Sequence, residues 1–288
     1  MKQALRCLLF CLLAATLSFG CDKKETVIDK VDDVKDKKIG VMTGSLGESL
    51  AKEKFPKAEV QCFDDIMDAV AAIKSGQLDA IITAYPTALQ VSKKNTELRM
   101  LPEPLDNEDT AVAIKKGNDA LLADVNRAIT EMRDDGTLDA MKKRWLKPDL
   151  SPYEEREIPL PQAGDPIKVG VSATREPLTF VDAKGRVTGY DGEIARMIGF
   201  KLNRPVEFLN MKYMALIPAL QSGKIDMIIS GMNATEERKK AVDFSLTYFA
   251  NSQVIVAKKP ASASTTSAFP LCSATRSWKY WGETGSPA

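Results

Sequence analysis

Histidine is missing from this chain: none of its 288 residues is a histidine. This absence removes the Ser-His-Asp and Cys-His arrangements that activate a nucleophile, and it removes the commonest protein ligand of zinc. A hydrolase with such a triad is therefore excluded, and a zinc enzyme is disfavoured. We expect no metal and no other cofactor.

An excess of charge of one sign is also missing. The 40 Lys and Arg residues offset 39 Asp and Glu residues, and they form no basic stripe. Because proteins bind nucleic acid through clustered positive charge, nucleic acid is not an expected partner. The hydrophobic fraction of 44% and the charged fraction of 27% are typical of a globular protein, and the length allows two domains.

Cysteines are few, and most of them lie at the N-terminus. Three of the five, Cys7, Cys11 and Cys21, fall within the first 21 residues. Residues 1–6 are positively charged, and residues 7–19 are apolar but too short to cross a bilayer comfortably. This pattern predicts a signal peptide.

The end of that segment indicates a lipid anchor. Residues 17–21, LSFGC, are similar to a bacterial lipobox, in which the cysteine is lipidated, although Phe19 stands where a small residue is usual. We expect lipidation at Cys21, and ordinary cleavage with release is the alternative. The remaining cysteines, Cys62 in a predicted strand and Cys272 near the end, are expected to be unpaired.

A repeat divides the chain into two similar parts. Residues 69–83, AVAAIKSGQLDAIIT, align with residues 216–230, LIPALQSGKIDMIIS. The repeat predicts two facing α/β units with a cleft between them, the usual place of a small-molecule site. Asp79 and Asp226 hold the same position in the two copies. They are a possible acid–base pair, but their place just before each predicted strand favours a structural turn role.

The segment after the second repeat has the features of an anion site. Residues 230–234 form a small polar loop, Thr235 is a good helix N-cap, and Arg238 follows in the first helical turn. Ligands of open α/β sheets bind beyond the carboxyl ends of strands, where a helix N-terminus favours an anion. Arg238 would add a bidentate grip on a carboxylate. The alternative is an exposed arginine paired with a neighbouring glutamate.

Longer motifs resemble a known family. VGVSATREPLTFVDAKGRVTGYDGEIA and LIPALQSGKIDMIISGMNATEERKKAVDFS, with DVKDKKIGVMTGS and LLADVNRAITEMRDDGTLDAMKKRWL earlier in the chain, are similar to the family 3 extracellular solute-binding proteins. These are periplasmic receptors that deliver polar amino acids to ABC transporters. The resemblance covers residues 36–259, but its two halves stand in reversed order.

The resemblance implies an α/β fold of the periplasmic-binding-protein type II, with two lobes around a cleft. The reversed order indicates either a circular permutant, with one hinge strand joining the lobes, or a fragment of a tandem protein. The expected parts are a signal peptide (1–21), a tether (22–36), a second-lobe unit (37–107), a returning strand and helices that pack on the first lobe (108–147), a Pro-rich linker (148–165), a first-lobe unit (166–259) and an irregular tail (260–288).

The resemblance also assigns the site. Arg238 matches the arginine that holds the ligand α-carboxylate, and Tyr213 matches an aromatic residue that covers the ligand, although a core role for Tyr213 is an equal alternative. Two positions depart from the family: Ala84 replaces the acid that holds the α-ammonium, and Arg175 replaces an aromatic residue. Arg175 suggests a more acidic ligand unless it points to solvent. Turn and cap chemistry is the alternative for Ser45 and Asn233. The full expected set is Arg238, Asn233, Ser230, Gly231, Tyr213, Ser45, Arg175 and Thr235.

The expected function follows from these assignments. We expect a monomeric periplasmic lipoprotein that captures a small polar amino acid or a related carboxylate and presents it to an ABC permease in the membrane. One alternative is a dehydratase-like enzyme on the same scaffold, acting on cyclic carboxylic acids, for which Glu193 or Glu176 would serve as general acid. The other is a ligand-sensing module. We do not expect an enzyme.

Overall fold

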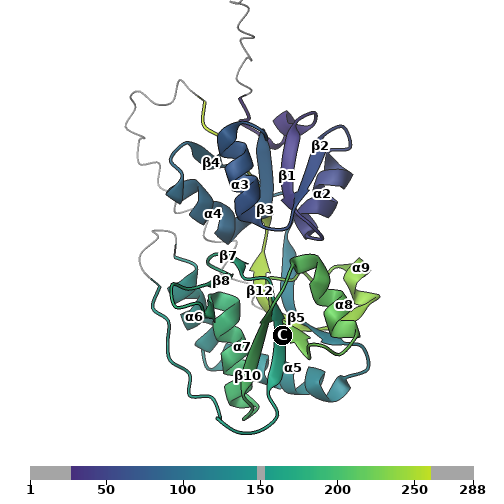
Figure 1. Ribbon diagram of the computed structural model, residues 1–288, viewed down its shortest axis with the longest axis vertical. Helices are drawn as coiled ribbons and strands as arrows, with labels where there is room; N and C mark the ends of the chain where they lie inside the picture. Colours follow the sequence, from purple (N-terminus) through teal and green to yellow (C-terminus); the bar gives the residue numbers. More distant parts are fainter. Residues whose placement is uncertain (1–26, 148–152, 261–288) are drawn as a thin grey trace, which may run out of the picture. The chain divides into compact units, whose positions relative to one another are not determined.

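The computed structural model describes residues 27–147 and 153–260 (Figure 1). The predicted signal peptide, Cys21 and nearly all of the expected tail, with Cys272, lie outside the described residues, as do residues 148–152 of the linker. Cys62 lies in a strand and is a free, exposed thiol. None of the helices in the two described ranges is both long and apolar enough to span a membrane.

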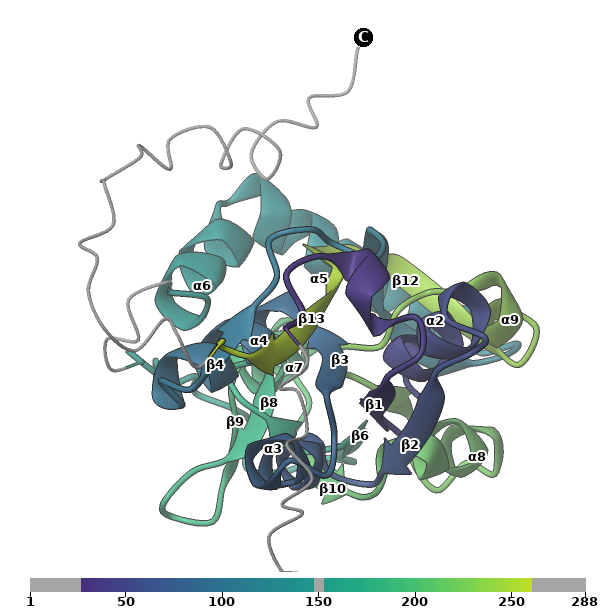
Figure 2. The same cartoon turned by 90° about the horizontal axis from the view of Figure 1, so that it is seen from above.

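Sheet A has five strands, and four of them come from the first part of the chain. Its order is β2 (Glu59–Phe63), β1 (Lys38–Met42), β3 (Ala80–Ala84), β13 (Gln253–Lys258) and β4 (Leu98–Met100). Strands β1, β2 and β3 are parallel, whereas β13 runs antiparallel to both of its neighbours. Figure 2 shows this sheet from above.

Sheet B also has five strands, and four of them come from the later part of the chain. Its order is β10 (Val206–Asn210), β6 (Ile167–Val171), β11 (Met227–Ile228), β5 (Glu108–Lys115) and β12 (Val242–Asn251). Strand β5 is antiparallel to β11 and β12. A separate small sheet contains β7 (Thr174–Arg175), β8 (Thr179–Val181) and β9 (Val187–Thr188).

Helices cover both faces of each sheet, because successive strand side chains point to opposite faces and each apolar face must be buried. In sheet A, Ile82 packs with α2 and its neighbour Ile81 packs with α3 and α4. In sheet B, α5, α6 and α7 cover one face and α8 the other. The helices are α2 (Leu46–Lys54), α3 (Ile66–Ser75), α4 (Tyr85–Lys94), α5 (Asp119–Asp134), α6 (Thr137–Trp145), α7 (Tyr190–Lys201), α8 (Leu216–Gln221) and α9 (Glu236–Lys239), with short 3₁₀ turns η1 (Val31–Val34) and η2 (Tyr213–Ala215).

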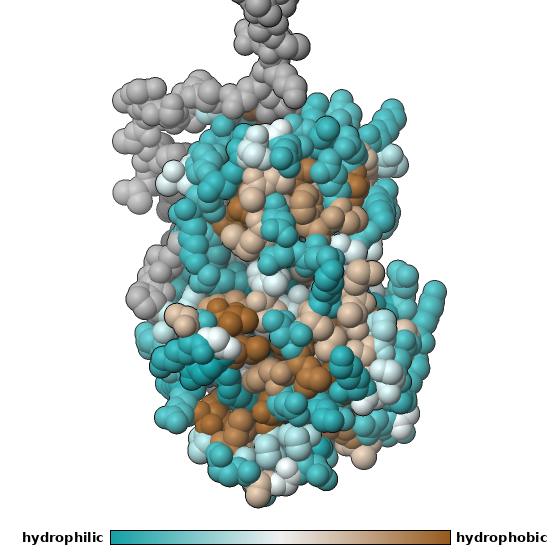
Figure 3. Space-filling view, in the orientation of Figure 1, coloured by the Kyte–Doolittle hydropathy of each residue, from teal (hydrophilic) through white to brown (hydrophobic). Residues whose placement is uncertain are grey.

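This architecture confirms the predicted α/β class with two units, each built on its own sheet. The core is divided in the same way, with separate hydrophobic clusters on the faces of sheet A and sheet B. Hydrophilic residues cover most of the surface seen in Figure 3, and hydrophobic residues gather mainly over the unit built on sheet B.

The expectation of a single hinge strand is wrong. The chain passes from sheet A to sheet B between β4 and β5, and it returns between β12 and β13. The last strand of the expected unit 166–259 therefore belongs to sheet A, where Val254 pairs with Thr83. The apolar run of β13 shows that it is buried, but nothing in its sequence says which sheet it joins.

The two repeats fold alike. Asp79 accepts a hydrogen bond from the backbone N–H of Lys38 at 2.9 Å, and Asp226 accepts one from Lys168 at 2.8 Å. Each aspartate thus joins the start of its repeat strand to the start of the opening strand. Gly76 and Gly223 end the preceding helices with φ of +80° and +77°, a conformation that favours glycine. The predicted structural role of the two aspartates is confirmed.

A buried ion pair joins α6 to α7. The Arg144 guanidinium donates to one carboxylate oxygen of Glu193, and the Trp145 indole N–H donates to the other. The side chain of Glu193 is only 2% exposed. Charges at this depth need a partner, because removing one leaves the other uncompensated in a medium of low polarity.

We therefore expect Arg144→Met to lower the free energy of unfolding by about 3–5 kcal/mol, the usual cost of breaking a buried pair. Urea unfolding followed by circular dichroism measures it. Arg127→Met is the matched control, because Arg127 pairs with Asp124 at the surface and should lose less than about 1 kcal/mol. Equal decreases in the free energy of unfolding of the two variants would show that the Arg144–Glu193 pair does not stabilise the fold as a buried ion pair.

Candidate functional site

Arg238 lies where two loops meet. Thr235 caps α9 by accepting a hydrogen bond from the Arg238 backbone N–H at 3.3 Å, which places the arginine in the first helical turn. Its guanidinium donates to the carbonyl of Asn233 at 3.0 Å and to the carbonyl of Gly44 at 2.8 Å. Gly44 belongs to the loop after β1, so this one side chain connects the units built on the two sheets.

The loop after β1 is shaped for that contact. Ser45 is the N-cap of α2, and its hydroxyl accepts a hydrogen bond from the Glu48 backbone N–H at 3.3 Å. Gly44 has a φ of +74°, and a Cβ atom there would lie only 3.2 Å from Cβ of Met214. Glycine therefore permits both the turn and the close approach of the two loops. Ser45 shares this loop, and its hydroxyl has the cap role.

Two guanidinium groups share one aromatic ring. The central guanidinium carbon of Arg238 lies 5.6 Å from the Tyr213 ring centroid, and that of Arg175 lies 4.9 Å from it. Both distances are within the range of a cation–π interaction. Tyr213 is 4% exposed and also packs in a hydrophobic cluster. It therefore has the core role, and it also forms the surface on which the two arginines meet.

Arg175 does not point to solvent. It is 5% exposed, and its guanidinium donates to the carbonyl of Ser230. The Ser230 hydroxyl, which is fully buried, accepts a hydrogen bond from the Ser172 backbone N–H at 2.9 Å. Gly231 follows with a φ of +53°, and a Cβ atom there would come within 3.3 Å of the Arg175 guanidinium. The backbone of Ser230 and Gly231 thus packs against the Arg175 guanidinium.

Asp191 supports the loop that contains Gly231, a role that the sequence analysis did not predict. Its buried carboxylate accepts hydrogen bonds from the hydroxyls of Thr179 at 2.6 Å and Tyr248 at 2.8 Å, and from the backbone N–H of Gly231. Burial raises the pKa of this carboxyl, while the hydrogen bonds and the charge of Arg175 oppose the shift. The carboxylate joins α7, β8 and β12 to the loop of residues 230–234.

Asn233 connects the loop of residues 230–234 to β5, a strand from the first part of the chain. It forms an isolated antiparallel bridge with Thr110 of β5, and both residues are buried. The Thr110 hydroxyl has no hydrogen-bond partner among the described residues. Sequence reasoning missed Thr110, because its closeness to Asn233 arises only when β5 enters sheet B.

Ala84, where the resemblance places the missing acid, lies at the end of β3. It is the N-cap residue of α4 and provides no side-chain cap. The residue is 2% exposed and belongs to the hydrophobic cluster that is otherwise built on sheet B. The position therefore has an apolar packing role, and it offers no charge to a ligand ammonium.

The two candidate general acids are held by other groups. Glu193 is bound by Arg144 and Trp145, as described above. Glu176 accepts a hydrogen bond from the Lys94 ammonium at 2.6 Å. Neither carboxylate forms an ion pair with Arg175 or Arg238, so the geometry gives no support to an acid catalyst beside the two arginines.

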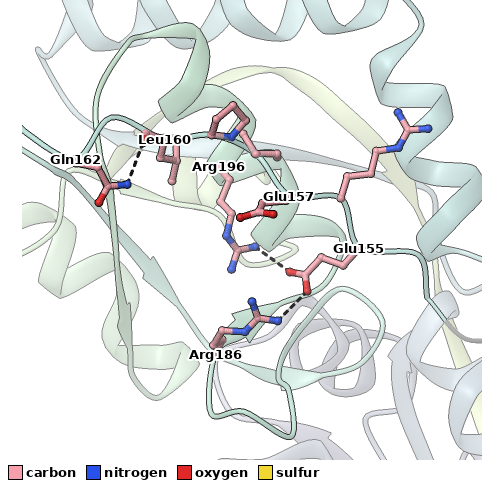
Figure 4. Close-up of a pocket in the computed structure, with 9 residues that line it drawn as sticks. Glu155, Glu157, Leu160, Gln162, Arg186 and Arg196 are labelled. Atoms are coloured by element: carbon pink, nitrogen blue, oxygen red, sulfur yellow. Dashed lines mark hydrogen bonds and ion pairs between the residues drawn. The ribbon is translucent and has the colours of Figure 1, made fainter.

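A separate hollow of about 710 Å³ lies beside the linker. Figure 4 shows Arg186 and Arg196 directed at Glu155, with ion pairs of 3.1 and 3.5 Å. The hydroxyl of Thr188 also donates to Glu155 at 2.8 Å. Because this carboxylate already has three partners, the arrangement explains how the linker is docked and does not indicate a ligand.

Comparison with known proteins supplies a family. The model of the bacterial extracellular solute-binding proteins, family 3, matches residues 35–148 and 167–269. The L-cystine-binding protein TcyJ of Escherichia coli (strain K12) is 35% identical over 128 residues, which are 44% of this chain and 48% of the relative. The ABC transporter glutamine-binding protein GlnH of Bacillus subtilis (strain 168) is 32% identical over 128 residues, 44% of this chain and 47% of the relative.

A third relative and a solved structure are similar over shorter stretches. The ABC transporter arginine-binding protein 1 of Escherichia coli (strain K12) is 38% identical over 34% of this chain and 40% of its own. An ancestral arginine-binding protein bound to arginine is 52% identical over 29% of this chain and 37% of its own, with a TM-score of 0.29. The chain thus spans about half or less of the length of these relatives.

The raised pKa of Asp191 predicts how stability depends on pH. The folded state keeps this proton at pH values where the unfolded chain has released it, so the group's contribution is complete below about pH 4 and falls as the pH rises toward the folded pKa. Urea unfolding of the wild type and Asp191→Asn between pH 3.5 and 7 tests this. The free energy of unfolding of the wild type minus that of Asp191→Asn should decrease as the pH rises.

Asp124→Asn provides the control, because Asp124 lies at the surface of α5 with its side chain 43% exposed. The difference in the free energy of unfolding between the wild type and Asp124→Asn should not decrease with pH as it does for Asp191→Asn. A difference for Asp191→Asn that stays constant or grows with pH would show that burial does not raise the pKa of this carboxyl.

Proposed function

This chain belongs to the bacterial extracellular solute-binding proteins of family 3, and we propose on that basis that it captures a small polar amino acid or a related carboxylate for an ABC importer. The similar proteins from Escherichia coli and Bacillus subtilis are named for binding cystine, glutamine and arginine. Its partners would then be the solute and a permease in the membrane.

The observation that carries this proposal is the environment of Arg238. Its guanidinium touches two backbone carbonyls, one in each unit, and it has no ion-pair partner among the described residues. The nearby Glu236 pairs instead with Lys239 at 2.7 Å. A guanidinium without a carboxylate partner, held at the meeting point of two loops, can bind a ligand carboxylate through two parallel hydrogen bonds.

The composition of the site favours the carboxylate end of the solute over an ammonium. Ala84 is apolar and packed, so it cannot pair with a ligand cation, and a buried ammonium without a partner costs several kcal/mol. The proposal therefore includes acids that lack an α-ammonium. The dehydratase alternative gains no support, because Glu193 and Glu176 are bound to Arg144 and Lys94.

Of the two alternatives for the reversed order of the halves, a circular permutant or a fragment of a tandem protein, we propose the circular permutant. Two observations support it: β5 from the first part completes sheet B, and β13 from the later part completes sheet A. Each sheet thereby contains a strand that the other half delivers, as expected if 38–147 and 166–258 together form one binding protein.

Removing the guanidinium tests the proposed binding role. We expect Arg238→Ala to weaken binding of any carboxylate solute by about 2–5 kcal/mol, as for loss of one partner of a desolvated charged pair. A library of amino acids and small dicarboxylates, screened by thermal shift and followed by calorimetry, identifies the solutes to compare. Arg127→Ala, on the outer surface of α5, is the control. Equal stabilisation of the wild type and Arg238→Ala by every active solute would remove Arg238 from the site.

We further propose that Cys21 carries a lipid that anchors the mature protein on the periplasmic side of the membrane. The support is the sequence before it, LSFGC. In bacteria given an alkyne-tagged fatty acid, the wild type should be labelled and should partition with the membrane, whereas Cys21→Ser should lose the label. Cys62→Ser serves as the control, and labelling that persists in Cys21→Ser would contradict the proposal.

A further inference from the structure

Arg175 and Arg238 place two positive charges at one point of the fold. Their guanidinium carbons lie 4.9 and 5.6 Å from the centroid of the same Tyr213 ring, which bounds their separation at 10.5 Å. Like charges within this distance repel each other, and a bound anion reduces that repulsion. The pair comes from different elements, β7 and α9, so it exists only in the folded chain.

Three acidic side chains next to this cluster have partners of their own. Glu48 binds the Lys52 ammonium and accepts a hydrogen bond from the Gly44 backbone N–H at 2.7 Å. Glu176 binds Lys94 at 2.6 Å, and Asp64 binds Lys212 at 2.5 Å. No ion pair joins Arg175 or Arg238 to any carboxylate whose side chain the structure describes.

Asp191 is the remaining carboxylate that interacts with Arg175, and it does so without forming an ion pair. It is bound by Thr179, Tyr248 and the Gly231 backbone N–H, which already occupy its two oxygens. These donors are neutral and do not offset any charge, so at most one carboxylate stands against two guanidinium groups, and the site around Tyr213 keeps an excess of positive charge.

Burial makes the excess positive charge energetically costly at Arg175. The side chain is 5% exposed, and one of its guanidinium nitrogens, Nε, is buried without a hydrogen-bond partner in the described ranges. A buried cation is stable only when its charge and its donors are satisfied. The carbonyl of Ser230 satisfies one terminal nitrogen, and a ligand anion would offset the positive charge that Asp191 alone leaves on the two guanidinium groups.

We propose that the Arg175–Tyr213–Arg238 cluster selects a doubly negative solute, a short dicarboxylate, with one carboxylate on each guanidinium. This inference rests on the proposed function, since it gives the solute class of the same site. Arg238 holds one acid group, as proposed above, and Arg175 decides whether the solute must carry a second.

The wild-type protein itself provides the first test. Calorimetry on the full mature chain compares glutarate with glutaramate, in which an amide of nearly the same shape replaces one carboxylate, and with glutamate, which adds an ammonium. We expect glutarate to bind at least tenfold more tightly than glutaramate and more tightly than glutamate. Glutaramate or glutamate binding as well as glutarate overturns the inference, whatever the variants do.

Two substitutions then assign the preference to Arg175. Arg175→Gln removes the charge and should reduce the glutarate-to-glutaramate ratio to about one, while glutaramate still binds through Arg238. Arg175→Lys keeps the charge and should retain most of the ratio. Arg127→Gln is the control and should bind both as the wild type does. Circular dichroism of each free variant confirms that it is folded, and the wild-type comparison stands if Arg175→Gln is not.

The outcomes separate this inference from the function on which it rests. If Arg238→Ala abolishes binding while Arg175→Gln leaves the glutarate-to-glutaramate ratio unchanged, the inference fails and the proposed function stands. If no amino acid or carboxylate solute binds the wild type, the proposed function fails as well.

Discussion

The exchange of two antiparallel strands is the constraint on which the rest of this structure depends. Sheet A is complete only when β13 enters between β3 and β4, and sheet B only when β5 enters between β11 and β12. An empty place in either sheet would leave a row of backbone N–H and C=O groups unpaired. Neither unit can therefore be finished without the part of the chain that forms the other.

The strand exchange also assembles the loops of the candidate site. Insertion of β5 brings Thr110 against Asn233, and the joining of the two units allows Arg238 to reach the carbonyl of Gly44. The loop that carries Asn233 is held from behind by Asp191, through the Gly231 backbone N–H. Backbone carbonyls and an aromatic ring thus hold the two guanidinium groups in place, and neither guanidinium forms an ion pair with a described carboxylate side chain.

Local chemistry made much of this site predictable. The N-cap role of Thr235, the place of Arg238 in the first helical turn and the turn roles of Asp79 and Asp226 depend on neighbours close in sequence or on the repeat. Asp191 and Thr110 could not be found in this way. Their partners come from elements tens of residues away, and a buried carboxylate in a helical first turn has no distinctive sequence pattern.

The sequence by itself determined the α/β class, the two repeated units, the family and the polar loop that ends in Arg238, because periodicity, caps and motifs are local properties. Only the tertiary structure decided that β13 joins sheet A, that Ala84 is a packing residue and that Arg175 turns inward onto Tyr213. The physical reason is that long-range packing determines which strands pair and which charges are buried. The sequence of a single segment does not specify these distant contacts.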